Sequence, residues 1–159
     1  MEKNIYTPEE EYWRNGGNTG TLPGRITPSQ INVLESNEIF VFGSNAQGAH
    51  GGGAAYFAMQ RFGAVWGIGE GLQGQSYAIP TMEGLESLAG AIYRFTSFAR
   101  EHKELDFFVT AIGCGIAGYT PEDIAPLFFK LKTPSLLNTF FPVSFWKVFL
   151  DLANKVKQP

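Results

Sequence analysis

The chain has 159 residues, with 12 Lys and Arg against 15 Asp and Glu, and so a formal net charge of −3. This length predicts one domain that can bury a core without a disulfide or a metal, and 44% hydrophobic with 17% charged residues exclude a disordered chain. The acidic balance argues against a general nucleic-acid-binding protein, whose footprint is an excess of Lys and Arg.

Cysteine and histidine are scarce, which excludes several kinds of site. Cys114 is the only cysteine, so neither an intrachain disulfide nor a zinc site of several cysteines can form, and His50 and His102 are too few for a His-rich metal site. We therefore expect a cytoplasmic protein with no bound metal and no cofactor. We also expect no membrane contact, because no apolar run reaches the ~20 residues of a membrane span and the first 17 residues are too polar for a secretory signal.

The polar N-terminal segment precedes the predicted globular part. We expect the first 24 residues to form an arm or an irregular segment, docked through Tyr12 and Trp13 on a single domain of residues 25–159. Thr27 is followed by a proline and then by Gln30, a pattern typical of a helix start. A short helix is therefore predicted over residues 28–34.

The rest of the chain alternates between apolar strand patterns and amphipathic helix patterns. Strands are predicted at residues 38–42, 64–68, 76–80 and 106–112 and within 136–141. Helices are predicted at residues 54–62, 85–102 and 121–131, and after Ser144 as the cap of a last helix. Strands that alternate with helices at this spacing predict an α/β fold, a three-layer α/β/α sandwich with a mostly parallel central sheet.

Glycine is concentrated where a strand passes into a helix. Eleven of the 19 glycines fall between Gly43 and Gly84, and GSNAQGAHGGG and GCGIAGY each lie between a predicted strand and a predicted helix. Backbone N–H groups at a helix N-terminus attract anions, and glycine lets a ligand approach the backbone closely. Ligands of open α/β sheets bind at the carboxyl ends of the strands. The two loops together therefore predict a site for a diphosphate.

Two common nucleotide-binding patterns do not explain these loops. Gly113, Gly115 and Gly118 match the dinucleotide fingerprint by letter, but only 41 residues follow Gly118, too few for the rest of a Rossmann fold. The following strand candidate also lacks the acidic residue that would bind a ribose. Neither loop ends in Gly-Lys-Ser/Thr, so the Walker A pattern is absent.

The order of the segments resembles a macro domain, the ADP-ribose-binding module. Gly24-Arg25-Ile26-Thr27 resembles the Gly-Asp-Ile-Thr opening of that family, FVFGSNAQGAHGGGA (residues 40–54) resembles its strand and Asn-bearing loop, and AIGCGIAGY (residues 111–119) resembles its Ala-Ile-Ser-Thr-Gly-Ile-Tyr-Gly-Tyr loop. The phrases FGSN…HGGGAA, GLQGQSYAIPT and IGCGIAGY are more specifically similar to a bacterial and phage branch of macro-like proteins. The resemblance covers residues 24 to 131 and implies a macro-like fold.

The resemblance also implies roles for individual residues. Asn45 would orient the distal ribose, and Tyr119 would replace the aromatic residue that packs on this ribose, because Ala117 stands at its position. Arg25 stands where the adenine-reading Asp is expected and would instead stack on the base or meet a phosphate. The implied ligand-binding residues are Arg25, Gly43, Ser44, Asn45, Gly51, Gly52, Gly53, Ala54, Gly113, Cys114, Gly115, Ile116, Ala117, Gly118 and Tyr119.

Several of these residues allow a structural role instead. His50 is the only titratable side chain of the first loop and suits proton transfer, but it could also be a solvated or phosphate-binding imidazole. Asn45 could close a turn, and the three glycines after His50 could simply form a tight entry into the helix. Cys114 could be a nucleophile paired with His50, or a small buried residue in a loop that needs small residues.

We therefore expect the protein to bind ADP-ribose or a related nucleotide diphosphate. As an enzyme, with His50 and Asn45 as its catalytic residues, it would be an ADP-ribosyl glycohydrolase or an ADP-ribose 1''-phosphate phosphatase. The alternatives are a non-catalytic binding module and a hydrolase that depends on Cys114. The expected partner is ADP-ribose or an ADP-ribosylated target, with nucleic acid only as a modified substrate.

Overall fold

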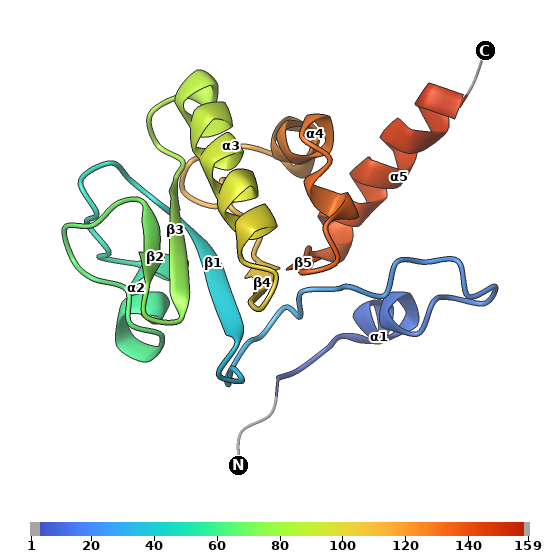
Figure 1. Ribbon diagram of the computed structural model, residues 1–159, viewed down its shortest axis with the longest axis horizontal. Helices are drawn as coiled ribbons and strands as arrows, with labels where there is room; N and C mark the ends of the chain where they lie inside the picture. Colours follow the sequence, from blue (N-terminus) through green and yellow to red (C-terminus); the bar gives the residue numbers. More distant parts are fainter. Residues whose placement is uncertain (1–3, 158–159) are drawn as a thin grey trace.

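A five-stranded sheet forms the centre of the computed structural model, which describes residues 4–157 (Figure 1). Its strands are β1 (Glu38–Ser44), β2 (Gly71–Gln73), β3 (Ser76–Pro80), β4 (Asp106–Val109) and β5 (Thr139–Phe140). Their order in space is β2-β3-β1-β4-β5. β1 pairs in parallel with β3 and β4, β4 pairs in parallel with β5, and β2 is antiparallel to β3. The predicted α/β fold with a mostly parallel sheet is therefore confirmed.

Helices cover both faces of this sheet. They are α1 (Pro8–Arg14), α2 (Gly53–Arg61), α3 (Leu85–Glu101), α4 (Pro121–Lys130) and α5 (Val143–Lys157), with a short 3₁₀ helix, η1 (Thr133–Ser135). α2 packs on one face, where its alanines meet Phe40 and Phe42 of β1. α3, α4 and α5 contribute to the core on the other face (Figure 1). The helices predicted at 54–62, 85–102 and 121–131 are confirmed to within one residue at each end.

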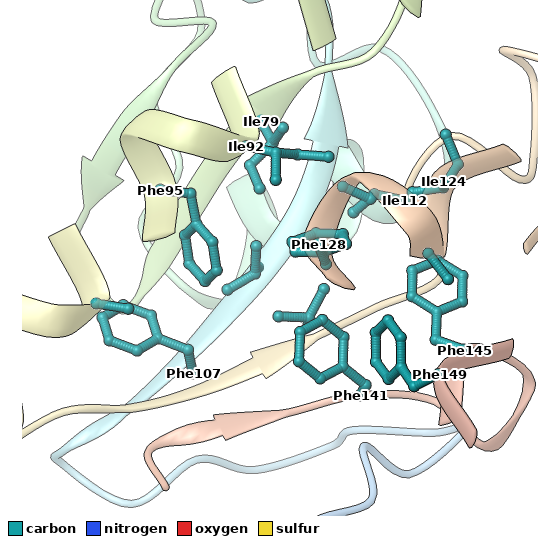
Figure 2. Packing of buried hydrophobic residues seen from close by; sticks show 14 of the residues in the cluster. Ile79, Ile92, Phe95, Phe107, Ile112, Ile124, Phe128, Phe141, Phe145 and Phe149 are labelled. Carbon is teal, nitrogen blue, oxygen red and sulfur yellow. The ribbon is translucent and has the colours of Figure 1, made fainter. Parts of the chain in front are cut away.

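Aromatic rings fill the larger of the two cores. Phe141 lies between Phe128 and Phe149, with its ring centroid 5.0 Å from each and its plane nearly perpendicular to that of Phe149 (Figure 2). Edge-to-face pairs of this kind add stability beyond the area that they bury. Val41 of β1 is fully buried in this core, while its neighbour Phe42 is fully buried in the core under α2. Packing on both faces therefore holds β1 in place, and with it the start of the loop that follows this strand.

We expected the N-terminal segment to be irregular, but it contains the helix α1. Thr7 caps this helix: its hydroxyl accepts a hydrogen bond from the Glu10 N–H at 3.1 Å, and the Glu10 carboxylate accepts one from the Thr7 N–H at 2.9 Å. Trp13 is 9% exposed and belongs to the larger core, so its predicted docking is confirmed, whereas Tyr12 is 42% exposed and does not belong to this core. The first three residues of the expected arm lie outside the described part of the chain.

The prediction of a helix over residues 28–34 was wrong. Gln30 instead forms an isolated antiparallel bridge with Ile5, whose N–H donates to the Gln30 carbonyl at 3.0 Å. The carboxylate of Glu10 accepts hydrogen bonds from both the N–H and the hydroxyl of Ser29. These contacts with the α1 segment hold residues 28–34 in a non-helical path and outweigh the local capping signal.

The strand predicted at residues 64–68 was also wrong. The side chain of Gln73 accepts a hydrogen bond from the Val65 N–H at 2.7 Å and donates one to the Ile68 carbonyl at 3.1 Å. These two bonds close the segment into a loop. The neighbouring strand β2, which pairs with β3, was not predicted.

Two boundaries also differ from the prediction. β4 ends at Val109, three residues before its predicted end, and the chain then turns, with the Ile112 N–H donating to the Thr110 carbonyl at 2.7 Å. The hydroxyl of Thr110 donates to the Val41 carbonyl at 2.7 Å. α5 begins at Val143, so Ser144 lies within its first turn and is not its cap. Within residues 4–157, no helix combines the length and the apolar character needed to cross a bilayer.

Candidate functional site

A cleft of about 330 Å³ lies where the strands end, within the 300–1,000 Å³ typical of ligand sites. Because β1 is parallel to both β3 and β4, their carboxyl ends share one edge of the sheet. Ser44 at the end of β1, Thr81 after β3 and Thr110 after β4 all line the cleft. The chain passes from β1 to β3 on one side and later to β4 on the other. The cleft therefore lies at a topological switch point, where open α/β sheets bind their ligands.

Most of the residues proposed from the sequence come together in this cleft. Those that line it are Gly43, Ser44, Asn45, Gly52, Gly53, Ala54, Gly113, Gly115, Ile116 and Ala117. Those that do not are Arg25, His50, Gly51, Cys114, Gly118 and Tyr119. The lining residues that the sequence analysis missed are Ala49, Ala55, Thr81, Met82, Thr110, Ala111 and Ile112. A signal existed for Thr81, which follows the strand predicted at residues 76–80, and for Thr110, which lies in the second half of the strand predicted at residues 106–112, because both strands end at this edge.

The N-terminus of α2 forms one side of the cleft and has no cap. Gly52, in the N-cap position, has an extended backbone (φ −163°) and no side chain to bond the helix, and the first turn contains no acidic residue. By contrast, α1 and α4 both have a Thr cap and acidic residues in the first turn. The first helical hydrogen bond of α2 runs from the Tyr56 N–H to the Gly52 carbonyl at 3.1 Å. The N–H groups of Gly53 and Ala54 therefore remain without intrahelical partners.

The second glycine loop forms the other side. It is closed by hydrogen bonds from the Tyr119 N–H to the Gly113 carbonyl at 2.9 Å and from the Gly118 N–H to the Gly115 carbonyl at 3.0 Å. Within residues 4–157, the N–H groups of Gly115, Ile116 and Ala117 bond no protein acceptor. Unpaired backbone donors thus lie on both sides of one cleft, an arrangement that suits an anion.

Asn45 lines the cleft, but its side chain is engaged within its own loop. Its carboxamide accepts a hydrogen bond from the Ala49 N–H at 2.9 Å and donates one to the Ala49 carbonyl at 3.2 Å. The Gly48 N–H also donates to the Asn45 carbonyl, at 3.0 Å. This geometry matches the turn-closing role that the sequence left open.

His50 lies beneath the first loop rather than in the cleft. Its side chain is fully buried, with its ring edge-on to Phe42 at 5.4 Å between centroids. Neither ring nitrogen has a hydrogen-bond partner within residues 4–157. His50 is buried although its neighbours Ala49 and Gly51 are both exposed, so no run of apolar residues marks this burial.

Cys114 and Tyr119 turn towards the larger core, against which both are packed. Burial raises the pKa of the Cys114 thiol, and the nearby carboxylates of Asp123 and Glu122 raise it further. Asp123 is itself part of the α4 cap, since its carboxylate accepts the Thr120 N–H at 2.9 Å. The thiol is therefore kept protonated at neutral pH, which disfavours it as a nucleophile.

Arg25 is held away from the cleft by backbone carbonyls. Its guanidinium donates to the carbonyls of Leu136, Thr139 and Pro134 at 2.7, 2.6 and 2.8 Å. The Arg25 carbonyl in turn accepts the indole N–H of Trp146 at 2.8 Å. Arg25 thus joins the N-terminal segment to η1, β5 and α5.

A larger groove of about 530 Å³ lies between α4, α5 and Glu9 of α1. An ion pair between Lys147 and Glu9, 3.0 Å long, connects α5 to α1 at this groove. No residue of the two glycine loops lines it. We therefore place the functional site in the smaller cleft.

Residues 4–157 contain no group of three or more His, Cys, Asp or Glu side chains that could hold a metal ion. No family model matches the chain, and neither the curated proteins nor the solved structures include a significant match.

Proposed function

We propose that the protein binds ADP-ribose, or a related nucleotide diphosphate, in the cleft between the two glycine loops. The observation that carries the proposal is the presence of unpaired backbone N–H groups on both sides of the cleft, at Gly53 and Ala54 and at Gly115, Ile116 and Ala117. Its second support is the resemblance of both loops to those of macro domains.

A diphosphate suits these donors physically. The N-terminus of a helix carries a partial positive charge and free N–H groups, which together favour a phosphate. No acidic side chain in the first turn of α2 competes for this position, and no charged side chain lines the cleft. Two neighbouring phosphates could each meet one loop, while Met82 and Ile116, which are 47% and 94% exposed, offer apolar contacts.

The cleft supports binding more directly than catalysis. None of its lining side chains is an acid, a base or a nucleophilic thiol, whereas a hydrolase needs a group that moves a proton or activates water. The enzyme alternatives, a glycohydrolase or a phosphatase with His50 as the catalytic residue, would need the buried ring of His50 to enter the cleft. We therefore favour a cytoplasmic binding module that recognises free ADP-ribose or an ADP-ribosylated target.

The glycines of the first loop provide a matched pair of variants. A Cβ atom added at Gly52 or at Gly51 would meet no atom within 4 Å beyond its chain neighbours, and neither residue has the positive φ that strains a substitution. Gly52 lines the cleft and Gly51 does not. Gly52→Leu therefore places a bulky group at the proposed site, and Gly51→Leu controls for the general effect of leucine in this loop.

The test is a titration with ADP-ribose, followed by thermal unfolding and by calorimetry. Ligand at 100 times its dissociation constant adds about 2.7 kcal/mol of stability, which raises the melting temperature by about 5–10 °C in a domain of this size. We expect this shift in the wild type and in Gly51→Leu, and an affinity at least about tenfold weaker in Gly52→Leu. Absence of binding in the wild type, or equal losses in both variants, would contradict the proposal.

A further inference from the structure

The polar side chains of the cleft are few. Among its lining residues, only Ser44, Asn45, Thr81 and Thr110 carry a hydroxyl or an amide group. A nucleobase is distinguished from another base by hydrogen bonds to its edge, which side chains or backbone groups must supply. The state of these four side chains therefore decides how well the cleft can read a base.

All four are already engaged with the backbone. The hydroxyl of Ser44 donates to the Gly69 carbonyl, and that of Thr81 donates to the Ser44 carbonyl at 3.2 Å. The hydroxyl of Thr110 donates to the Val41 carbonyl at 2.7 Å.

The amide of Asn45 is bonded to Ala49 through both its oxygen and its nitrogen. A ligand that drew away the Ser44 hydroxyl or the Asn45 amide would deprive a backbone group of that partner. The hydroxyls of Thr81 and Thr110 share their acceptor carbonyls with the N–H group of the same residue, so each is part of a two-donor contact. The side chains therefore fix the shape of the cleft and are poorly placed to select its ligand.

Stacking and charge are absent from the lining as well. No aromatic, acidic or basic side chain belongs to it, and Arg25, the residue that the sequence placed against the base, is bound to three carbonyls elsewhere. The exposed apolar side chains of Ile116 and Met82 can touch any base equally well. An apolar surface discriminates weakly between ligands of similar shape, whereas a site built on hydrogen bonds discriminates strongly.

We infer that the cleft recognises the diphosphate of its ligand and not the base, so that its ligand class is nucleoside diphosphates and their sugar conjugates irrespective of base. The inference rests on the proposed function. It specifies that the backbone N–H groups, which bind the diphosphate, determine which ligands the cleft accepts. Anions bound by backbone N–H groups contribute most of the affinity, and the base lies against an apolar surface that is indifferent to its identity.

The test is a calorimetric titration of the intact chain with ADP, GDP, UDP, ADP-ribose and AMP. We expect the dissociation constants of ADP, GDP and UDP to agree within about tenfold, and AMP to bind at least tenfold more weakly than ADP because it offers a single phosphate. If ADP binds more than tenfold more tightly than both GDP and UDP, the base is read and the inference is overturned. If AMP binds as tightly as ADP, the diphosphate is not the recognised group and the inference is equally overturned.

The glycine variants distinguish failure of this inference from failure of the proposed function. Gly52→Leu is expected to weaken ADP, GDP and UDP by the same factor, and Gly51→Leu to leave all three unchanged. A variant effect confined to ADP would overturn the inference while leaving nucleotide binding in the cleft intact. If none of the five ligands binds the wild type, both the inference and the proposed function fall.

Discussion

The carboxamide of Asn45 holds the backbone of Ala49 from both sides, accepting from its N–H at 2.9 Å and donating to its carbonyl at 3.2 Å. Both residues line the cleft, and the chain continues from Ala49 through the buried ring of His50 to the uncapped start of α2. The Asn45 amide and the buried His50 ring therefore both contribute to the shape of the first glycine loop, together with the Glu83 carboxylate, which accepts the Ala46 N–H at 3.0 Å.

The first prediction concerns this amide. Asn45→Ala removes both bonds to Ala49, and we expect the free energy of unfolding to fall by about 1–2 kcal/mol. ADP-ribose should also bind more weakly, because ordering the loop then opposes binding. Asn45→Asp keeps the bond from the Ala49 N–H, but it places a carboxylate beside the Ala49 carbonyl and in the proposed diphosphate site, so it should bind ADP-ribose no more tightly than Asn45→Ala. Denaturant unfolding and calorimetry measure the two effects, and lost binding with unchanged stability would show that Asn45 contacts the ligand directly.

The second prediction concerns His50. Both nitrogens of its buried ring lack partners in the described part of the chain, and a buried polar group without a partner costs about 1–3 kcal/mol. His50→Phe keeps a flat ring against Phe42 and removes these polar atoms, so we expect stability to rise by about 1 kcal/mol. ADP-ribose affinity should stay within twofold of wild type. If the wild type cleaves an ADP-ribosylated target and His50→Phe binds the target without cleaving it, His50 is catalytic and the binding-module proposal is wrong.

Much of the fold could be predicted because its signals are local. The apolar run of β1, the spacing of apolar residues in α3 and the Thr-Pro start of α4 each lie within one short segment. The glycine loops could be placed at one end of the sheet for the same reason, since each directly follows an apolar strand. Most of the cleft lining could therefore be predicted, because it consists largely of residues from these two loops.

The errors occurred where distant segments decide the structure. Arg25 bonds carbonyls more than 100 positions away in the sequence, and Ser29 bonds Glu10. The sequence around Arg25 or Ser29 does not indicate which distant groups these residues contact. The burial of His50 likewise depends on Phe42 of β1 and on the packing of α2, which no spacing rule specifies.

The third prediction follows from the carbonyl contacts of Arg25. Arg25→Leu removes three donors and leaves the carbonyls of Pro134, Leu136 and Thr139 short of partners. Because hydrogen bonds from a charged group are each worth about 1.5–3 kcal/mol, we expect the unfolding free energy to fall by about 2–4 kcal/mol. Arg25→Lys should restore part of it, since an ammonium group reaches fewer acceptors in this geometry.

Ligand affinity is the matching control for this variant, because Arg25 does not line the cleft. Under conditions where Arg25→Leu remains folded, ADP-ribose should bind as it does to the wild type. A stable Arg25→Leu protein that fails to bind ADP-ribose would place this side chain at the ligand after all, as the sequence first indicated.

The fourth prediction concerns the pH dependence of stability. Tyr77 is 4% exposed, and its ring packs against Phe95 and Phe98 at 5.1 and 5.3 Å between centroids. Burial raises its pKa to about 12 from a usual value of 10.0, and the Glu70 carboxylate adds to the effect. The fold thus favours the neutral phenol, whose contribution to stability is fully present below pH 10 and is lost as the pH rises towards 12.

Tyr77→Phe isolates this contribution, because it keeps the ring and removes the ionisable group. At pH 11 the unfolded chain has largely ionised at this position and the folded chain has not, which corresponds to about 1.4 kcal/mol. Urea unfolding at pH 8, 10 and 11 should therefore show Tyr77→Phe gaining about that much on the wild type between pH 8 and pH 11. Tyr93→Phe is the control for removal of a tyrosine hydroxyl from the surface, since Tyr93 is 59% exposed. Parallel pH profiles for the wild type and Tyr77→Phe would show that the Tyr77 phenol ionises as readily in the folded protein as in the unfolded chain.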